Sequence, residues 1–170
     1  YYLGHLRRNK GELLKSAASF ERSLRLYPVD PAALFWLGDD QLELGRLSAA
    51  EVSFKRMLEI QSDSVAALYG LGRVAHERRD YRAAIDFFER ALSHDGHASR
   101  IHYSLAMSYR ALDQLDDARA HLDQSAGGEV SPPDPLMEEL GGLLESAMAY
   151  QARGIRALER EEWAAAADYF

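Results

Sequence analysis

A period of 34 residues runs through this sequence and constrains its fold more than any other feature. The dipeptide Leu-Gly recurs at this spacing at positions 3–4, 37–38 and 71–72, and Leu-Ala follows at 105–106. A second signal has the same period, because a small residue is followed four positions later by a large one. These pairs are Ser16 and Phe20, Ala50 and Phe54, Ala84 and Phe88, and Ala118 and Leu122. A period of this length is typical of a solenoid, in which each unit buries its apolar face against its neighbours.

The apolar spacing divides each unit into two helices. In the second unit, Leu37 and Gln41 share one face of a first helix, and Ala50 and Phe54 share one face of a second. Gly45 interrupts the pattern between them and predicts the turn. Each unit is therefore expected to be a helical hairpin.

The turn inside each hairpin needs a residue that tolerates left-handed backbone dihedrals. Gly11 and Gly45 suit this position, whereas Arg79 and Asp113 occupy it in the later units, so we expect strain or different capping there. Between units, Asp30-Pro31 predicts a capped helix start with proline at the first helical position. Ser62-Asp63-Ser64 and His94-Asp95-Gly96 are weaker versions of the same signal.

The small residues have a packing reason. Two antiparallel helices approach closely only where one offers little side chain. We therefore expect Gly38 to face Ala50 while Phe54 fills the space beyond, and the next unit to repeat this arrangement.

These residues resemble the signature of the tetratricopeptide repeat family, in which W-x2-L-G-x2-Y, A-x3-F and P follow one another in a 34-residue unit. The opening tryptophan is replaced by Leu34, Leu68 and His102, and the closing proline survives only as Pro28. The resemblance covers about nine tenths of the chain. It implies an all-α, right-handed superhelical solenoid of stacked antiparallel helix hairpins.

The period also predicts the internal boundaries of a single solenoid over residues 1–170. The expected segments are a partial repeat at 1–30, repeats at 31–64, 65–98 and 99–132, a helical insertion at 133–146 and a partial repeat at 147–170. In the insertion, Asp134 and Pro135 predict the start of one long helix that ends near Arg160, with a kink or close contact at Gly141-Gly142. This part of the chain resembles larger bacterial repeat proteins. Because solenoids need polar capping repeats, the open ends suggest part of a longer array.

The composition argues against several classes of function. A formal charge of -7 argues against general nucleic-acid binding, which needs a basic face. With no cysteine, the chain has no disulfide, thiolate metal site or cysteine nucleophile. No stretch reaches the roughly 20 apolar residues that cross a bilayer, so no direct membrane insertion is expected. The excess of arginine over lysine suggests a bacterial source, and a soluble protein of the cytoplasm, periplasm or cell envelope fits these features.

Catalytic and metal-binding patterns are weak. His94, Asp95, His97 and His102 form a loose set of metal ligands, without the helical HExxH spacing of zinc sites, and a polar loop is the favoured interpretation. No GxSxG turn or phosphate-binding glycine loop is present. We expect a non-enzymatic protein without a metal or cofactor.

The resemblance implies that the first helix of each unit lines the concave side of the superhelix. One position on that side is aromatic in every complete unit, and the positions one and two turns further are mostly polar. We predict the partner-binding residues to be Tyr1, His5, Arg8, Phe35, Asp39, Tyr69, Arg73, His76, Tyr103, Met107 and Arg110. A competing interpretation is that tyrosine is common at this position in the family even where no ligand is known.

These observations predict a protein-protein interaction scaffold or adaptor that binds a partner peptide or helix in the concave groove. Aromatic and arginine side chains suit such binding because they give large, rigid and charge-assisted contacts. The alternative is a structural subunit docked permanently in a larger multiprotein assembly, including one associated with a membrane. The lysine and asparagine pattern with which some relatives clamp a terminal carboxylate is missing.

Overall fold

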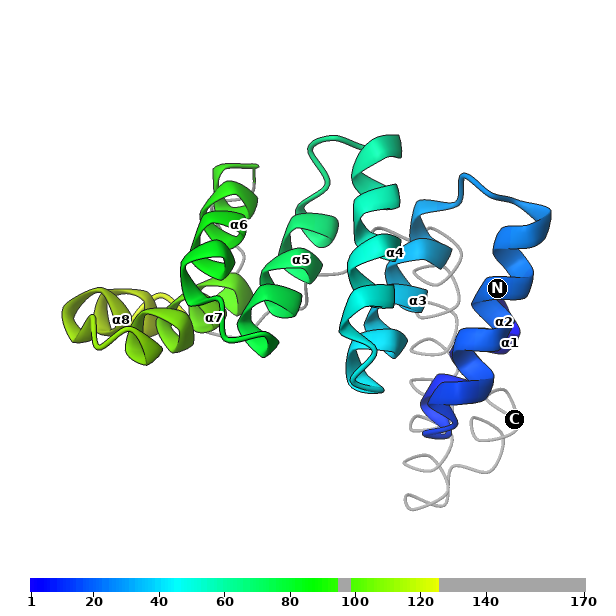
Figure 1. The fold of residues 1–170 in the computed structure, drawn as a ribbon, viewed down its shortest axis with the longest axis horizontal. Coiled ribbons are helices and arrows are strands. Elements are labelled where there is room, and N and C mark those ends of the chain that lie inside the picture. Colours follow the sequence, from blue (N-terminus) through cyan, green and yellow to red (C-terminus); the bar gives the residue numbers. More distant parts are fainter. Residues whose placement is uncertain (95–98, 126–170) are drawn as a thin grey trace, which may run out of the picture. The chain divides into compact units, whose positions relative to one another are not determined.

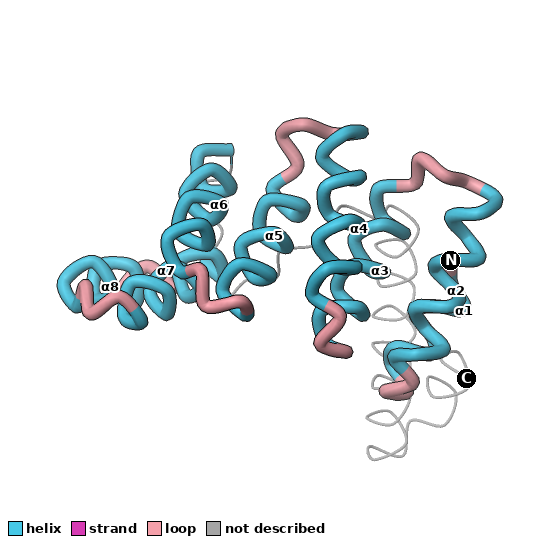
Figure 2. Tube along the Cα trace, in the orientation of Figure 1, coloured by secondary structure: helices cyan, strands magenta, loops and turns pink. Residues whose placement is uncertain are grey.

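The computed structural model describes residues 1–94 and 99–125, and within them the protein is all-α (Figures 1 and 2). Figure 2 shows helices joined by short loops, without a strand in the described part. The predicted insertion, the predicted long helix and the last partial repeat lie outside the described residues. The hairpins described below are formed by residues 1–94 and 99–125.

Successive helices form antiparallel hairpins in chain order. The pairs are α1 (Tyr2–Asn9) with α2 (Leu13–Leu26), α3 (Pro31–Glu43) with α4 (Leu47–Ile60), α5 (Val65–Glu77) with α6 (Tyr81–His94), and α7 (Ser99–Ala111) with α8 (Leu115–Leu122). Each helix packs against the next, and the first helices also contact one another from α3 to α5 and from α5 to α7. First helices of neighbouring hairpins therefore share one face, called the groove face below (Figure 1).

The turns inside the hairpins have the backbone that the sequence predicts. Gly11 and Gly45 have φ values of 74° and 71°, and Arg79 and Asp113 both have φ of 62°. A non-glycine residue in this region is sterically disfavoured, so the expected strain at Arg79 and Asp113 is confirmed. The hairpin geometry outweighs the local preference of these two residues.

Side-chain caps start several of the helices. Asp30 Oδ1 accepts a hydrogen bond from Ala33 N at 3.1 Å, with Pro31 at the first helical position, as predicted. Ser64 Oγ accepts from Ala67 N at 3.4 Å and caps α5. The predicted cap at His94-Asp95-Gly96 falls largely outside the described residues.

Buried phenylalanine rings pack directly against glycines of the first helices. The ring of Phe54 lies against Gly38 of its own hairpin and Gly70 of the next, where an added Cβ would come within 2.8 Å and 2.5 Å of the ring. Phe20 contacts Gly4, and Phe88 contacts Gly72, in the same way. All three rings are fully buried. As expected, Phe54 fills the space beside Gly38, whereas its contact with Gly70 of the next hairpin was not predicted.

This packing predicts that Gly70→Val destabilises the protein. The new side chain would overlap the ring of Phe54, and overpacking of this kind typically costs about 1 to 3 kcal/mol. Glu59→Val introduces the same side chain at an exposed helical position and serves as the control. Urea denaturation of both variants measures the difference. Equal free energies of unfolding for the two variants would contradict the close contact between the Phe54 ring and Gly70.

A histidine pair joins the two helices of the last described hairpin. His102 Nδ1 and His121 Nδ1 lie 2.9 Å apart, a distance at which one nitrogen donates a single proton to the other. The ring of Tyr109 stacks on His121, and its hydroxyl donates a hydrogen bond to Glu89 Oε1 at 2.7 Å. Burial and the Glu89 contact raise the pKa of Tyr109 to about 12. Burial and the neighbouring His102 lower the pKa of His121, although Glu89 and Asp117 oppose this shift.

The lowered pKa of His121 predicts a loss of stability at acidic pH. The unfolded chain binds this proton at a higher pH than the folded chain, so folding stability falls as the pH drops below the ordinary value of 6.5. Thermal unfolding between pH 7.5 and 5.5 should therefore show a smaller decrease in Tm for His121→Gln than for the unchanged protein. His94→Gln, at an exposed position, is the control. An unchanged pH slope in His121→Gln would contradict this account of the pair.

Candidate functional site

A pocket of about 240 Å³ opens on the groove face. Every described residue that lines it belongs to the first helix of a hairpin. They are His5, Arg8 and Asn9 of α1, Phe35, Trp36, Asp39 and Glu43 of α3, Tyr69 and Arg73 of α5, and Arg100 of α7. The pocket is thus assembled by side chains from successive repeats.

Helical spacing explains how α3 and α5 supply these residues. Phe35, Asp39 and Glu43 follow one another at intervals of four, so they share one face of α3. Tyr69 and Arg73 of α5 occupy the same two positions one period later as Phe35 and Asp39. The repeat therefore places a carboxylate on α3 opposite a guanidinium on α5.

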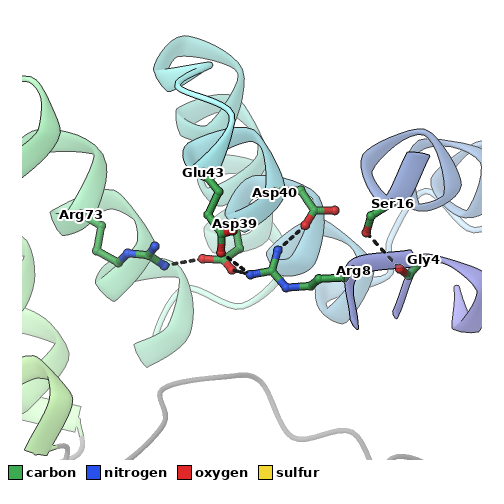
Figure 3. Close-up of polar contacts among 7 residues, drawn as sticks. All are labelled: Gly4, Arg8, Ser16, Asp39, Asp40, Glu43 and Arg73. Carbon is green, nitrogen blue, oxygen red and sulfur yellow. Dashed lines mark hydrogen bonds and ion pairs between the residues drawn. The ribbon is translucent and has the colours of Figure 1, made fainter. Parts of the chain in front are cut away.

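Arg8 is held by three carboxylates of α3 (Figure 3). Its guanidinium donates to Asp40 Oδ1, to Asp39 Oδ2 and, at 2.5 Å, to Glu43 Oε1. It also lies 5.3 Å from the centre of the Trp36 ring, which adds a cation-π contact. Burial alone would lower the pKa of Arg8, but attraction by the three carboxylates outweighs burial and raises this pKa. Arg8 is therefore a fixed cation of the pocket wall.

Asp39 links three hairpins. One carboxylate oxygen accepts from Arg8 of α1 and the other from Arg73 of α5, while Asp39 itself belongs to α3 (Figure 3). The residue is 5% exposed, so little water competes for its oxygens. Arg73 also lies 5.7 Å from the centre of the Tyr69 ring. This chain of ion pairs holds the pocket side chains of three hairpins together.

Asp40 is fully buried behind Arg8. Its Oδ1 accepts a hydrogen bond from Arg8, but its Oδ2 has no hydrogen-bond donor among the described residues. The hydroxyl of Ser16 donates instead to Gly4 O at 3.0 Å. Burial raises the pKa of Asp40, against the opposing effects of Ser16 and Arg8. Arg8 is the cation that compensates this buried carboxylate.

The pocket brings together part of the predicted partner-binding set. It is lined by His5, Arg8, Phe35, Asp39, Tyr69 and Arg73. Phe35 and Tyr69 contribute mainly as packed walls, because both are buried.

The other predicted residues lie outside this pocket. Tyr1 packs its ring on His5 and Phe20, and His76 Nδ1 lies 2.9 Å from Ser108 Oγ. Met107 is half-buried, Arg110 is exposed, and Tyr103 is 53% exposed on α7. The aromatic residues at the repeated position are Tyr1, Phe35, Tyr69 and Tyr103, and Tyr103 is the most exposed of the four.

Sequence reasoning missed Asn9, Trp36, Glu43 and Arg100 of the pocket lining, and Asp40 behind it. Glu43 could have been found, since it lies four residues after Asp39 on the same helical face. Arg100 and Asp40 had no such signal. Arg100 reaches the pocket through its long side chain from the start of α7, and Asp40 faces the contact with the preceding hairpin.

No metal centre or membrane span is found in the described part of the chain. Residues 1–94 and 99–125 contain no group of three or more histidine, aspartate or glutamate side chains placed to hold a metal ion. Asp95 and His97 of the loose ligand set fall outside these ranges, and His102 is paired with His121. Among the same residues, none of the helices has the length and apolar character needed to cross a membrane.

The hairpins and the glycine-phenylalanine packing define a helical repeat protein. The tetratricopeptide repeat profile matches residues 1–65 and 38–99, and a second profile of that description matches residues 75–127. The chain belongs to the tetratricopeptide repeat family. A comparison with curated proteins finds no match.

Solved structures with the same fold include repeat proteins of low sequence identity. A crystal structure of MamA matches 98% of this chain over 90% of its own length, with 22% identity and a TM-score of 0.64. TTC0263, a thermophilic TPR protein from Thermus thermophilus, matches 73% of this chain over 70% of its length, with 23% identity and a TM-score of 0.68. MamA from Desulfovibrio magneticus RS-1 matches 99% over 88%, with 18% identity and a TM-score of 0.65. The fold supports a general role as a protein-protein interaction scaffold, and proteins of this family are typically non-enzymatic.

The ion-pair arrangement predicts that Arg8→Met destabilises the protein by about 3 kcal/mol, because removing one partner leaves a buried charge uncompensated. The buried carboxylate of Asp40 would bear most of this cost, since it loses the cation bonded to Oδ1. Arg8→Met/Asp40→Asn should therefore recover a large part of the loss. Chemical denaturation of the two single variants and the double variant measures the coupling. Additive effects of the two substitutions would contradict it.

Proposed function

We propose that this chain binds a partner peptide or helix at the pocket of the groove face. The observation that carries the proposal is the chain of ion pairs from Arg8 through Asp39 to Arg73, which holds the charged walls of the pocket in one arrangement. Because these side chains are already held in place, they lose little further conformational entropy when a partner binds. The site is thus suited to binding before the partner is present.

The composition of the pocket suits a protein ligand. Trp36 is half-buried and sits beside the guanidinium of Arg8, and Tyr69 sits beside that of Arg73. Tryptophan, tyrosine and arginine are the residues most often responsible for binding energy in protein interfaces. Tyr103 extends the aromatic surface along α7, so a partner longer than the pocket has a further contact.

This proposal predicts that Trp36→Ala and Tyr103→Ala each weaken partner binding. Affinity purification with the intact chain, followed by mass spectrometry, identifies the partner, and titration calorimetry then measures its affinity for each variant. Loss of an aromatic anchor should raise Kd by roughly tenfold or more, the usual cost of removing an interface hot spot. Circular dichroism melts establish that each variant is folded.

Tyr27→Ala provides the matched control. Tyr27 is 69% exposed in the loop between α2 and α3 and does not line the pocket. It should leave Kd unchanged. Folded Trp36→Ala and Tyr103→Ala variants with the affinity of the unchanged chain would contradict binding at the groove face.

A second candidate function is a structural subunit docked in a larger multiprotein assembly. Its support is an apolar surface on the first hairpin, where Leu3, Leu6 and Leu14 are each more than half exposed. Partner purification separates the two functions. A partner whose binding is lost in Leu6→Ser but kept in Trp36→Ala would favour docking through this surface.

A further inference from the structure

The charges of the pocket are unevenly distributed. Arg8, Arg73 and Arg100 line it together with Asp39 and Glu43, and Asp40 lies behind Arg8. All three carboxylates, however, gather around Arg8 (Figure 3). The charged residues that α5 and α7 contribute to the pocket lining are Arg73 and Arg100, beside the ring of Tyr69.

Arg73 has unused donors. A single nitrogen, Nη1, bonds to Asp39, although a guanidinium offers five N–H donors in a planar fork. The Arg73 side chain is 30% exposed, so the remaining donors can reach a ligand. The ring of Tyr69 beside it restricts where the guanidinium can lie.

Arg100 supplies a second cation. It lines the same pocket from α7 and forms no ion pair with any described residue. Every other arginine that lines the pocket is paired with a carboxylate. Arg100 is therefore the cation whose compensation is left to a ligand.

The pocket already contains a carboxylate placed between two arginines. Asp39 is bound by Arg8 from the preceding hairpin and Arg73 from the following one. Arg73 of the third hairpin and Arg100 of the fourth both line the same pocket. A ligand carboxylate there would be bound as Asp39 is, by guanidinium groups from two repeats.

We infer that the pocket binds an aspartate or glutamate side chain of the partner between Arg73 and Arg100. This inference rests on the proposed function and names the chemistry that the partner must present. A phosphoryl group, with a charge of about -1.5 to -2, fits less well because Arg100 is the one arginine of the pocket without a carboxylate partner among the described residues. One carboxylate matches the single uncompensated cation.

A display experiment tests this inference. A phage library of random twelve-residue peptides is selected against the full chain, in parallel with its Arg100→Gln and Arg25→Gln variants. Arg25 is an exposed arginine of α2 that does not line the pocket, so its variant is the matched control. Selected peptides are then synthesised with glutamate or glutamine at the enriched position, and with a free or an amidated C-terminus.

We expect peptides selected on the unchanged chain and on Arg25→Gln to share an acidic residue at a fixed position. Its replacement by glutamine should weaken binding at least tenfold, whereas Arg100→Gln should abolish the preference and amidation should leave it intact. Peptides that bind without an acidic residue, keep their preference in Arg100→Gln, or require a free C-terminus would overturn the inference. They would leave the proposed function standing. A library that yields no specific peptide would count against both, as would self-association of the chain through Arg100 in light scattering.

Discussion

The contact between a buried phenylalanine ring and the glycines around it is the constraint on which the rest of the structure depends. Phe54 touches Gly38 within its hairpin and Gly70 in the next, so one ring sets both the spacing inside a repeat and the spacing between repeats. A single methyl group at either glycine would collide with the ring. Because a close-packed interior has no spare volume, this contact leaves few arrangements for neighbouring helices.

The close approach of the hairpins makes the groove face possible. Asp39 of α3 binds Arg8 of α1 and Arg73 of α5 at once, which requires the first helices of three hairpins to lie close together. The buried Asp40 behind them depends on the same alignment, since its charge is compensated by a residue of another hairpin. Burying such charges costs solvation free energy, and a hydrophobic replacement could be as stable. We therefore interpret the network as fixing the geometry of the site more than adding to stability.

Much of the fold could be predicted from the sequence because the repeat presents each signal several times. Two glycines and two non-glycine residues at equivalent positions predicted the turns, and all four have positive φ. The contact of Phe54 with Gly70 of the next hairpin was not predicted, because helical periodicity gives the face of a residue but not the direction of its side chain. The residues of the candidate site were harder to predict, because side-chain directions also decide which of them line the pocket. Asp39 and Arg73 follow from the periodicity, whereas Asp40 and Arg100 depend on how far a side chain reaches between repeats.

The central claim of this account is that Asp39 joins three hairpins into one preorganised face, the one proposed to bind a partner. Native-state hydrogen exchange of Asp39→Asn, compared with the unchanged chain, tests it most directly, because exchange reports the local stability of each helix separately. The account predicts faster amide exchange in α1, α3 and α5 together, with α8 unaffected. Faster exchange confined to α3 would contradict it, because the ion pairs would then be local contacts that do not unite the repeats.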